Sequence, residues 1–375
     1  MKVLILKLFT HLLNVIYAFF KTLKTQKKVV MISRQSNEIN DDFKLLGDEF
    51  TKKGYEVKYL CRTLDGGVNS TLFTKIGYGF HLFTQMYHLS TSEICVLDTY
   101  CLVASILKHK KELKIVQIWH SIGTLKQFGW QIAGSGEGSS KMIAETMKMH
   151  KNYDVIYCAG NAYKDFLAEG FGVSADKIRI FTLPRIDLLK SKEYTDKTKL
   201  EITEKYPVLK EKENVVYAPT FRKDDSEFNK YFENLVKEFD FDKYNLIVKL
   251  HPLSKTEVNY SRVIVDKVFT TFQMLCCADK LISDYSCIVY EAGVINIPLY
   301  FYNFDFDTYA DVRGLTINYD ELPGFKSRTA KELVESLEKT YDYDYLKSYI
   351  NKYVENTEDC AKKMVEDIIN FEVQK

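Results

Sequence analysis

The sequence is poor in the residues that interrupt regular structure, and it lacks an excess of charge of either sign. Its 375 residues include only 6 prolines and 17 glycines, and Lys+Arg (52) and Asp+Glu (51) leave a net charge of +1. So few prolines and glycines argue against long disordered linkers. The balanced charge lacks the basic field of a nucleic-acid-binding protein, so no nucleic acid is expected as a partner. With 46% hydrophobic residues, the chain can bury a large core, and its length predicts about two domains.

Motifs that hold metals, disulfides or nucleotides are also missing. The eight cysteines include the adjacent pair Cys276-Cys277 but no C-x-x-C spacing, so neither a zinc site nor a disulfide framework is indicated, and we expect a reducing compartment. No G-x-G-x-x-G follows the first strand of either half, and the glycine-rich segment 134–140 lacks the Gly-Lys-Ser/Thr of a P-loop. A redox dinucleotide is therefore not expected. We predict no cofactor and find no spacing typical of metal ligands.

The N-terminal segment 1–27 is strongly apolar but carries a polar stripe. On a helix, Lys7, His11, Asn14 and Lys21 fall on one side, and large apolar residues cover the broad remainder. A membrane-spanning helix does not normally keep such a stripe, and the small residues of a signal-peptide cleavage site are missing. We therefore predict an amphipathic helix in a membrane interface, with its lysines toward anionic lipid headgroups. The alternative is an ordinary core helix, for which the apolar face is too wide.

From residue 28 the pattern changes to strands that alternate with helices. Strands are predicted at 29–33, 57–60, 93–97, 113–119, 155–159 and 178–183 in the first half, and at 214–217, 246–250, 281–282 and 297–301 in the second. Such alternation is typical of an α/β fold with parallel sheets. We predict two Rossmann-like domains, an N-terminal one over 28–205 and a C-terminal one over 206–345, with helices over 346–375 that pack back on the region of the cleft between them.

Polar residues follow four predicted strands of the second half. They are Thr220, His251, the Asp284-Tyr285-Ser286 turn, and Asn303. Because the carboxyl ends of parallel strands share one edge of a sheet, we expect these residues to converge where open α/β folds bind ligands. Pro252 cannot continue a ladder, so it places His251 at the end of its strand.

Ser286 is predicted at or next to the N-terminus of a helix over 288–294. Free N–H groups and the helix dipole at such a position favour an anion such as phosphate, although serine and aspartate are also ordinary helix caps. An acidic, aromatic loop containing Asp305 and Asp307 then leads to Arg313. We predict that the Arg313 guanidinium closes over that anion as a bidentate clamp.

The stretch WHSIGTLKQFG, residues 119–129, is the most informative part of the first half. It places His120 just past a strand and Lys126 shortly after it. Imidazole suits general-base chemistry because its pKa lies near neutral pH, and the lysine offers a cation to the same substrate. A single histidine in a loop is more often structural.

Two α/β domains with polar strand ends facing a central cleft are the plan of a GT-B enzyme.

Several of these stretches together resemble the CDP-glycerol glycerophosphotransferase family. The matching segments are QIWHSIGTLK (117–126), PRID (184–187), YAPTFR (217–222), LHP (250–252), LISDY (281–285) and Arg313-Gly314. The pattern W-H-S-x-G-T-x-K followed by F-G is closer to the primase-like members than to the W-H-G-T-P-L-K polymerases. Two departures are Cys287, which replaces the second serine of D-Y-S-S, and Thr182-Leu183, which replace a glycine before P-R-x-D.

The resemblance implies a CDP-polyol donor, CDP-glycerol or CDP-ribitol, held mainly by the C-terminal domain. It implies an undecaprenyl-diphosphate-linked disaccharide as acceptor and peripheral attachment to the cytoplasmic face of the cell membrane. The family's functional histidines fall on His120 and His251, and its phosphate-contacting residues fall on Ser286 and Arg313. Further substrate-binding candidates are Thr220, Arg222, Lys126, Asp284 and Arg185.

The expected reaction is transfer of a polyol phosphate in teichoic acid synthesis. We expect His120 to take the proton of the acceptor hydroxyl as it attacks the β-phosphorus. The residues expected to hold the diphosphate and stabilise the CMP leaving group are His251, Ser286, Thr220 and Arg313. Two alternatives remain open: an inverting GT-B glycosyltransferase that uses a sugar nucleotide, and a catalytically silent membrane-bound scaffold. The motifs distinguish neither glycerol from ribitol nor one addition from many.

Overall fold

The computed structural model describes residues 2–63, 72–136, 138–222, 226–251, 254 and 256–373, without the side chains of residues 2, 72–75, 226, 312 and 313. Pro252 therefore lies outside the described residues. The chain divides into two compact units. The first comprises Met1–His120, Phe128–Arg185 and Glu355–Lys375, and the second comprises Ser121–Gln127 and Ile186–Val354. Each unit is built around its own parallel sheet.

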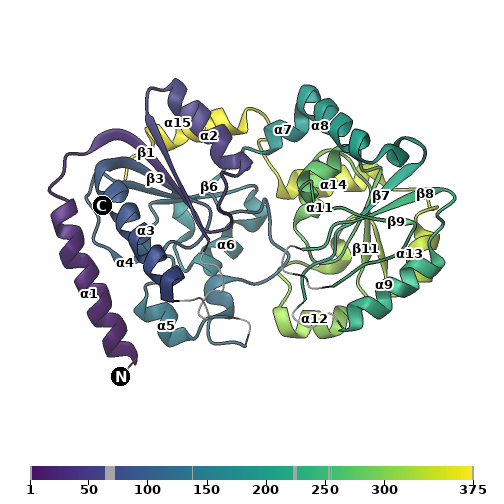
Figure 1. Ribbon diagram of the computed structural model, residues 1–375, viewed down its shortest axis with the longest axis horizontal. Coiled ribbons are helices and arrows are strands. Elements are labelled where there is room, and N and C mark those ends of the chain that lie inside the picture. The colour runs from purple at the N-terminus through teal and green to yellow at the C-terminus, as the bar shows by residue number, and fades with distance from the viewer. Residues whose placement is uncertain are drawn as a thin grey trace. The chain divides into compact units, whose positions relative to one another are not determined.

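The first unit has the strand order β2-β1-β3-β4-β5-β6, with neighbouring strands parallel. The strands are β1 (Gln26–Ser33), β2 (Glu56–Cys61), β3 (Ser92–Leu97), β4 (Lys114–Gln117), β5 (Val155–Cys158) and β6 (Ile178–Ile180). The helices of this unit include α2 (Asp41–Lys52), α3 (Leu72–Thr91), α4 (Leu102–Ile106), α5 (Lys141–Thr146), α6 (Lys164–Phe171) and α15 (Cys360–Asn370). The C-terminal α15 packs against α2 (Figure 1). The strand order reverses between β1 and β3, which makes that edge a topological switch point.

Helix α1 (Lys2–Phe20) lies on the outside of the first unit (Figure 1). A narrow side of it is anchored: Asn14 donates to the carbonyl of Ile106 at 3.2 Å and accepts from the N–H of Lys108 at 2.9 Å, and Tyr17 is fully buried. Part of the predicted polar stripe therefore faces protein. By length and composition Val3–Phe20 could cross a membrane, and only 11% of it is buried.

The second unit has the strand order β12-β11-β10-β7-β8-β9, again with parallel neighbours. The strands are β7 (Glu213–Tyr217), β8 (Tyr244–Val248), β9 (Val263–Val265), β10 (Lys280–Ser283), β11 (Leu299–Tyr302) and β12 (Phe325–Ser327). The helices include α7 (Ile186–Lys190), α8 (Lys192–Lys205), α9 (Ser226–Glu238), α10 (Thr271–Met274), α11 (Ile288–Val294), α12 (Phe306–Arg313), α13 (Ala330–Ser336) and α14 (Tyr343–Tyr353). This is the Rossmann order, with its switch point between β7 and β10.

The predicted α/β class with two Rossmann-like sheets is confirmed, and α11 has the bounds that the sequence predicted. The predicted loop between Asp305 and Arg313 is wrong, because Phe306–Arg313 forms helix α12. The Asp305 side chain makes no cap hydrogen bond at the start of this helix. Contacts from elsewhere in the unit, described below, hold it in place.

The segment Ser121–Gln127 joins the second unit although it directly follows His120 in sequence. It runs antiparallel to the chain after α12, with a bridge between Lys126 and Leu315. The N–H of Gln127 donates to the carbonyl of Gly314 at 3.1 Å, and the N–H of Thr316 donates to the carbonyl of Leu125 at 3.1 Å. Lys126 is thereby placed among the residues of the C-terminal sheet.

Candidate functional site

The second sheet brings the predicted polar strand ends to one edge. Strands β11, β10, β7 and β8 are consecutive neighbours and parallel, so the residues after them lie side by side. Asp284, which follows β10, is fully buried. Its Oδ1 accepts hydrogen bonds from the N–H groups of Thr220 at 2.9 Å and Tyr285 at 2.6 Å. Asp284 therefore ties the loop after β7 to the loop after β10 at the switch point.

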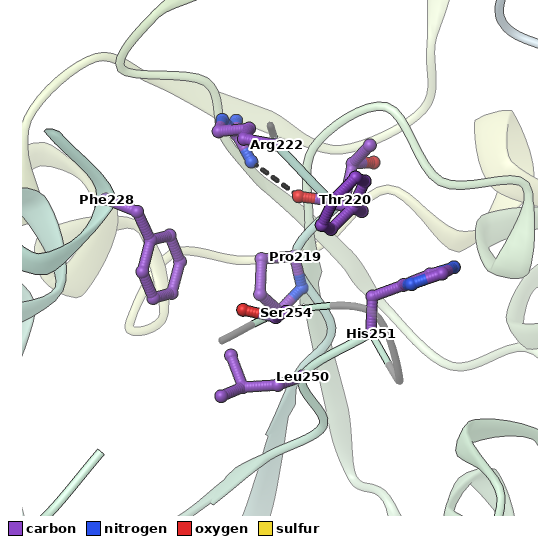
Figure 2. Close-up of a pocket in the computed structure, with 8 residues that line it drawn as sticks. Pro219, Thr220, Arg222, Phe228, Leu250, His251 and Ser254 are labelled. Carbon is purple, nitrogen blue, oxygen red and sulfur yellow. Dashed lines mark hydrogen bonds between the residues drawn. The ribbon is translucent and has the colours of Figure 1, made fainter. Parts of the chain in front are cut away.

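Arg222 forms the second part of this framework. Its guanidinium pairs with Asp284 at 2.9 Å and bonds Asp305 through two nitrogens. It also donates to the carbonyl of Thr220 at 2.8 Å, the bond that Figure 2 shows. Burial opposes the charge, but the carboxylates of Asp284 and Asp305 raise the pKa of Arg222 above its ordinary value. The ring of Tyr309 in α12 stacks on Tyr285 with centroids 3.9 Å apart. These contacts position α12 and the backbone of Thr220.

A small hollow opens beside this framework. Its apolar wall includes Phe228 and Leu250, and its polar lining includes Thr220 and His251 (Figure 2). The hydroxyl of Thr220 is buried and has no hydrogen-bond partner among the described residues. A buried hydroxyl without a partner costs about 1–3 kcal/mol, so this one is available to a ligand that enters the hollow.

Lys126 supplies positive charge to the same unit. Partial burial, and then the ammonium of Lys126, lower the pKa of His251. Burial raises the pKa of the Cys287 thiol, and Lys126 opposes that rise. Lys126 thus acts on both His251 and the residue that precedes α11. A hydroxyl, an imidazole and an ammonium suit an anion better than a neutral ligand.

The structure gives fewer contacts for the predicted phosphate ligands Ser286 and Arg313. Ser286 is half-buried, and its hydroxyl accepts from the N–H of Ile288 at 3.4 Å, just before α11 begins. Arg313 is the last residue of α12, and its side chain lies outside the described atoms. The next residue, Gly314, has φ 65°, and a Cβ there would meet the side chain of Gln127 at 2.7 Å. Glycine is therefore required beside Arg313, while anion binding by Ser286 and Arg313 stays a prediction.

In the first unit, a strained turn presents His120 after β4. Trp119 has a left-handed backbone with φ 63°, a conformation that costs a non-glycine residue about 1–2 kcal/mol. The side chain of Gln117 accepts from the N–H of Trp119 at 2.9 Å, and the Trp119 ring packs on Phe128 at 4.8 Å and Phe171 at 5.1 Å. Strain of this kind clusters at functional sites, and it was not visible in the sequence.

The environment of His120 favours a neutral imidazole. Its Nδ1 lies 3.2 Å from the carbonyl oxygen of Asp98, so with Nδ1–H as donor the Nε2 atom carries the lone pair. His120 is an exposed residue, but surrounding protein atoms lower its pKa below the ordinary value and Arg185 lowers the pKa further, against the hydrogen bond with Asp98. A neutral His120 is ready to accept a proton at pH 7.

Arg185, a predicted substrate-binding residue, contacts the protein on two sides. Its guanidinium donates to the carbonyl of His120 at 2.7 Å and pairs with the buried Asp42 at 3.5 Å. Asp42 also accepts from the Arg185 N–H at 2.8 Å. These contacts position His120, and binding of substrate by Arg185 stays a prediction. The sequence did not predict a role for Asp42, because a carboxylate in the first turn of a helix is common.

Among the described residues, no cluster of three or more His, Cys, Asp or Glu side chains is arranged to hold a metal ion.

Comparisons with known proteins agree with this picture. A family model described as CDP-glycerol:poly(glycerophosphate) glycerophosphotransferase matches residues 15–369. The teichoic acid glycerol-phosphate primase of Bacillus subtilis is 25% identical over 387 residues, which cover 96% of this chain and 97% of the primase. The teichoic acid poly(ribitol-phosphate) polymerase of Bacillus spizizenii is 27% identical over 384 residues. That alignment covers 97% of this chain but only 60% of the polymerase, so the chain spans less than two thirds of this relative.

A solved structure also resembles the chain. It is the wall teichoic acid polymerase TagF, as a histidine-to-asparagine variant soaked with CDPG, with a TM-score of 0.76 at 17% identity. The match covers 97% of this chain and 96% of that chain. At this identity the likeness shows the fold, and it confirms the predicted GT-B type.

Proposed function

The chain belongs to the CDP-glycerol:poly(glycerophosphate) glycerophosphotransferase family, and from this membership we propose that it transfers glycerol phosphate or ribitol phosphate in teichoic acid synthesis. The donor is CDP-glycerol or CDP-ribitol. The acceptor is an undecaprenyl-diphosphate-linked saccharide, and the released product is CMP. The relatives include both a glycerol-phosphate primase and a poly(ribitol-phosphate) polymerase, so both donors belong in the proposal.

The donor diphosphate binds at the switch point of the second sheet. The observation that carries this is the buried Thr220 hydroxyl without a partner, beside His251 and within a unit that also holds Lys126. The hydroxyl and the ammonium bind phosphate oxygens directly. Asp284 and Arg222 keep the Thr220 backbone in place. Ser286 and Arg313 complete the set of proposed phosphate ligands.

The chemical step is attack of an acceptor hydroxyl on the β-phosphorus of the donor. A new oxygen–phosphorus bond forms to the acceptor, and the bond from that phosphorus to the bridging oxygen breaks, so CMP leaves with the bridging oxygen. Nε2 of His120 takes the hydroxyl proton. Phosphoryl transfer needs mainly positioning and charge stabilisation, and His251, Lys126 and Thr220 stabilise the negative charge that moves to the leaving group.

The enzyme acts at a membrane surface, with α1 lying in the interface on the cytoplasmic side. The support is that α1 exposes large apolar side chains, including Leu8 at 67% and Phe19 at 74%. Such exposure of large apolar side chains is unfavourable in water and favourable at a bilayer.

Product analysis tests the proposal against its main rival. Purified protein is incubated with CDP-glycerol and, separately, CDP-ribitol, each with a lipid-linked disaccharide. Release of CMP supports polyol-phosphate transfer. Release of UDP or CDP from a sugar nucleotide instead identifies an inverting GT-B glycosyltransferase. Absence of any turnover, with donor binding also absent, identifies a silent scaffold.

A further inference from the structure

Helix α3 exposes an apolar stripe on its outer face. The exposed stripe is Ile76, Phe80, Phe83 and Tyr87, at 50%, 70%, 40% and 39% exposure. Its spacing of i, i+4, i+7 and i+11 follows one face of a helix. Gln85, on the inner face, is buried. A soluble helix normally turns polar side chains to solvent, so the outer face of α3 is suited to an apolar environment.

Helix α1 adds a second exposed apolar stripe next to this one. The two helices pack together, as Figure 1 also shows, and Phe20 contacts Tyr87 with ring centroids 6.4 Å apart. Leu4, Leu8, Leu12 and Phe19 of α1 are exposed. Neither α1 nor α3 contains Asp or Glu. We call these eight exposed side chains of α1 and α3 the α1/α3 face.

The inner face of α3 holds polar atoms that lack partners. His81 Nε2 and Gln85 Nε2 are buried and have no hydrogen-bond partner among the described residues. Each such atom is costly in a protein interior. Tyr78, one turn before, is hydrogen-bonded to Arg34. The side of α3 that carries Tyr78 and His81 therefore lies toward the edge where β1 and β2 end.

Two arginines follow those strands. Ser33 of β1 pairs with Cys61 of β2, and the N–H of Arg62 donates to the carbonyl of Ser33 at 3.1 Å, so Arg34 and Arg62 leave neighbouring strands at the same level. Arg34 donates to the carbonyl of Tyr100 at 3.3 Å, and Arg62 donates to the carbonyl of Gly77 in α3 at 3.2 Å. Both side chains are held by backbone oxygens and still exposed.

Neither arginine forms an ion pair within the part of the chain that the structure describes. Arg34 follows β1, which borders the switch point of the first sheet between β1 and β3, where open α/β folds bind ligands. Arg62 follows β2, the neighbouring strand on the other side of β1. Two guanidinium groups there match an anion with two phosphates, because each can make bidentate bonds to phosphate oxygens. The adjacent α1/α3 face matches a hydrocarbon chain.

We propose that Arg34 and Arg62 bind the diphosphate of a lipid-linked acceptor whose hydrocarbon chain lies against the α1/α3 face. This rests on the proposed function for the identity of the acceptor. The shared chemistry is a lipid-borne phosphate, and the position of Arg34 beside a switch point favours a specific diphosphate over the headgroups of bulk phospholipid.

A binding experiment on the full chain tests the site without requiring turnover. Farnesyl diphosphate is the probe, and binding of farnesol, of inorganic pyrophosphate and of phosphatidylglycerol vesicles is measured separately for comparison. We expect farnesyl diphosphate to bind at least about tenfold more tightly than farnesol or pyrophosphate, and Arg34→Ala/Arg62→Ala to weaken it about tenfold or more. Lys52→Ala, an exposed lysine on α2 paired with Glu49, should leave it unchanged.

A second pair of variants separates the hydrocarbon contact from the charge contact. Phe80→Glu should weaken farnesyl diphosphate but not pyrophosphate, whereas Leu200→Glu, an exposed leucine of α8 at 54%, should affect neither. Unchanged binding of farnesyl diphosphate by the double arginine variant would overturn the proposal. Arginine-dependent binding to phosphatidylglycerol vesicles with no affinity for farnesyl diphosphate would also overturn it, in favour of a bulk-lipid surface.

Steady-state kinetics of the transfer reaction then test whether this site takes part in the reaction. The double arginine variant should raise the KM for a diphosphate-linked acceptor about tenfold or more and leave the KM for the CDP-polyol unchanged. With an alkyl glycoside acceptor that lacks the diphosphate, variant and unmodified protein should behave alike. If the unmodified protein releases no CMP, the proposed function fails. The binding experiment with farnesyl diphosphate still decides whether the diphosphate site exists.

Discussion

The guanidinium of Arg222 donates two hydrogen bonds to the carboxylate of Asp305, from Nε to Oδ2 at 2.6 Å and from Nη2 to Oδ1 at 3.0 Å. Asp305 directly precedes α12, so this pair connects the loop after β7 to the helix that ends at Arg313. The Arg222 side chain is only 9% exposed. Its contacts with protein position the site, and binding of substrate by Arg222 stays a prediction.

Arg222→Ala should therefore destabilise the second unit strongly. The substitution leaves the carboxylates of Asp284 and Asp305 buried without their cation, which costs about 3–5 kcal/mol in comparable cases. Denaturant unfolding measures the loss of free energy. Lys192→Ala, which breaks the exposed Lys192–Asp196 pair, is the control and should change stability by less than about 1 kcal/mol. Equal small effects of both variants would show that the Arg222 network does not hold the unit together.

His120→Ala should lower kcat by about 100- to 10,000-fold, the usual contribution of a general base. The affinity for the CDP-polyol, measured by calorimetry, should stay unchanged, because the donor ligands lie in the other unit. Near-normal turnover at saturating donor would rule out His120 as the base.

The pH dependence follows from the lowered pKa of His120. A base must be deprotonated, so activity should be present above that pKa and fall as the pH drops through it. Because the pKa lies below the ordinary 6.5, the acid limb of kcat assigned to His120 should have its midpoint below pH 6.5. A midpoint clearly above 6.5 that disappears in His120→Gln would contradict the assigned environment.

Thr220→Val removes a hydroxyl that bonds nothing in the described protein. We expect the free energy of unfolding to stay the same or rise, and the Kd for the CDP-polyol to increase about tenfold or more as a charge-assisted bond to phosphate is lost. Thr203→Val is the matched control, because the Thr203 hydroxyl donates to the carbonyl of Leu200 at 3.1 Å. It should cost about 1 kcal/mol of stability and leave the Kd unchanged. The reverse pattern would refute the role of Thr220.

Lys126→Met should raise the pKa of His251. Burial is the larger cause of the lowered pKa and remains, but the repulsion by the Lys126 ammonium is lost, so the pKa should move toward 6.5 without reaching it. Histidine titration by NMR measures the change, and His150, whose pKa is lowered by burial alone, serves as internal reference. A pKa of His251 that does not move would place Lys126 too far away to act on the same anion.

The strands and α11 could be predicted because their signals are local. The strand segments before Thr220, His251 and Asp284 are apolar and are followed by polar turns. Because parallel strands have their carboxyl ends at one edge of the sheet, the residues after them lie at the same edge. The match of Ile288–Val294 to the predicted helix has the same origin.

Other features depend on contacts between distant residues. Helix α12 forms where Arg222 and Tyr285 hold Asp305 and Tyr309, which no window of sequence contains. The left-handed Trp119 depends on a hydrogen bond from its N–H to Gln117 and on ring packing. The membership of Lys126 in the second unit arises from its pairing with Leu315, far along the chain.

The central claim is that the bond broken lies between the β-phosphorus and CMP. The most direct measurement uses CDP-glycerol and CDP-ribitol labelled with ³²P in the phosphate next to the polyol, together with a lipid-linked disaccharide. The account predicts that the label appears in the lipid-linked product and that unlabelled CMP is released. Label that remains in a released nucleoside diphosphate, with none in the lipid product, would contradict it.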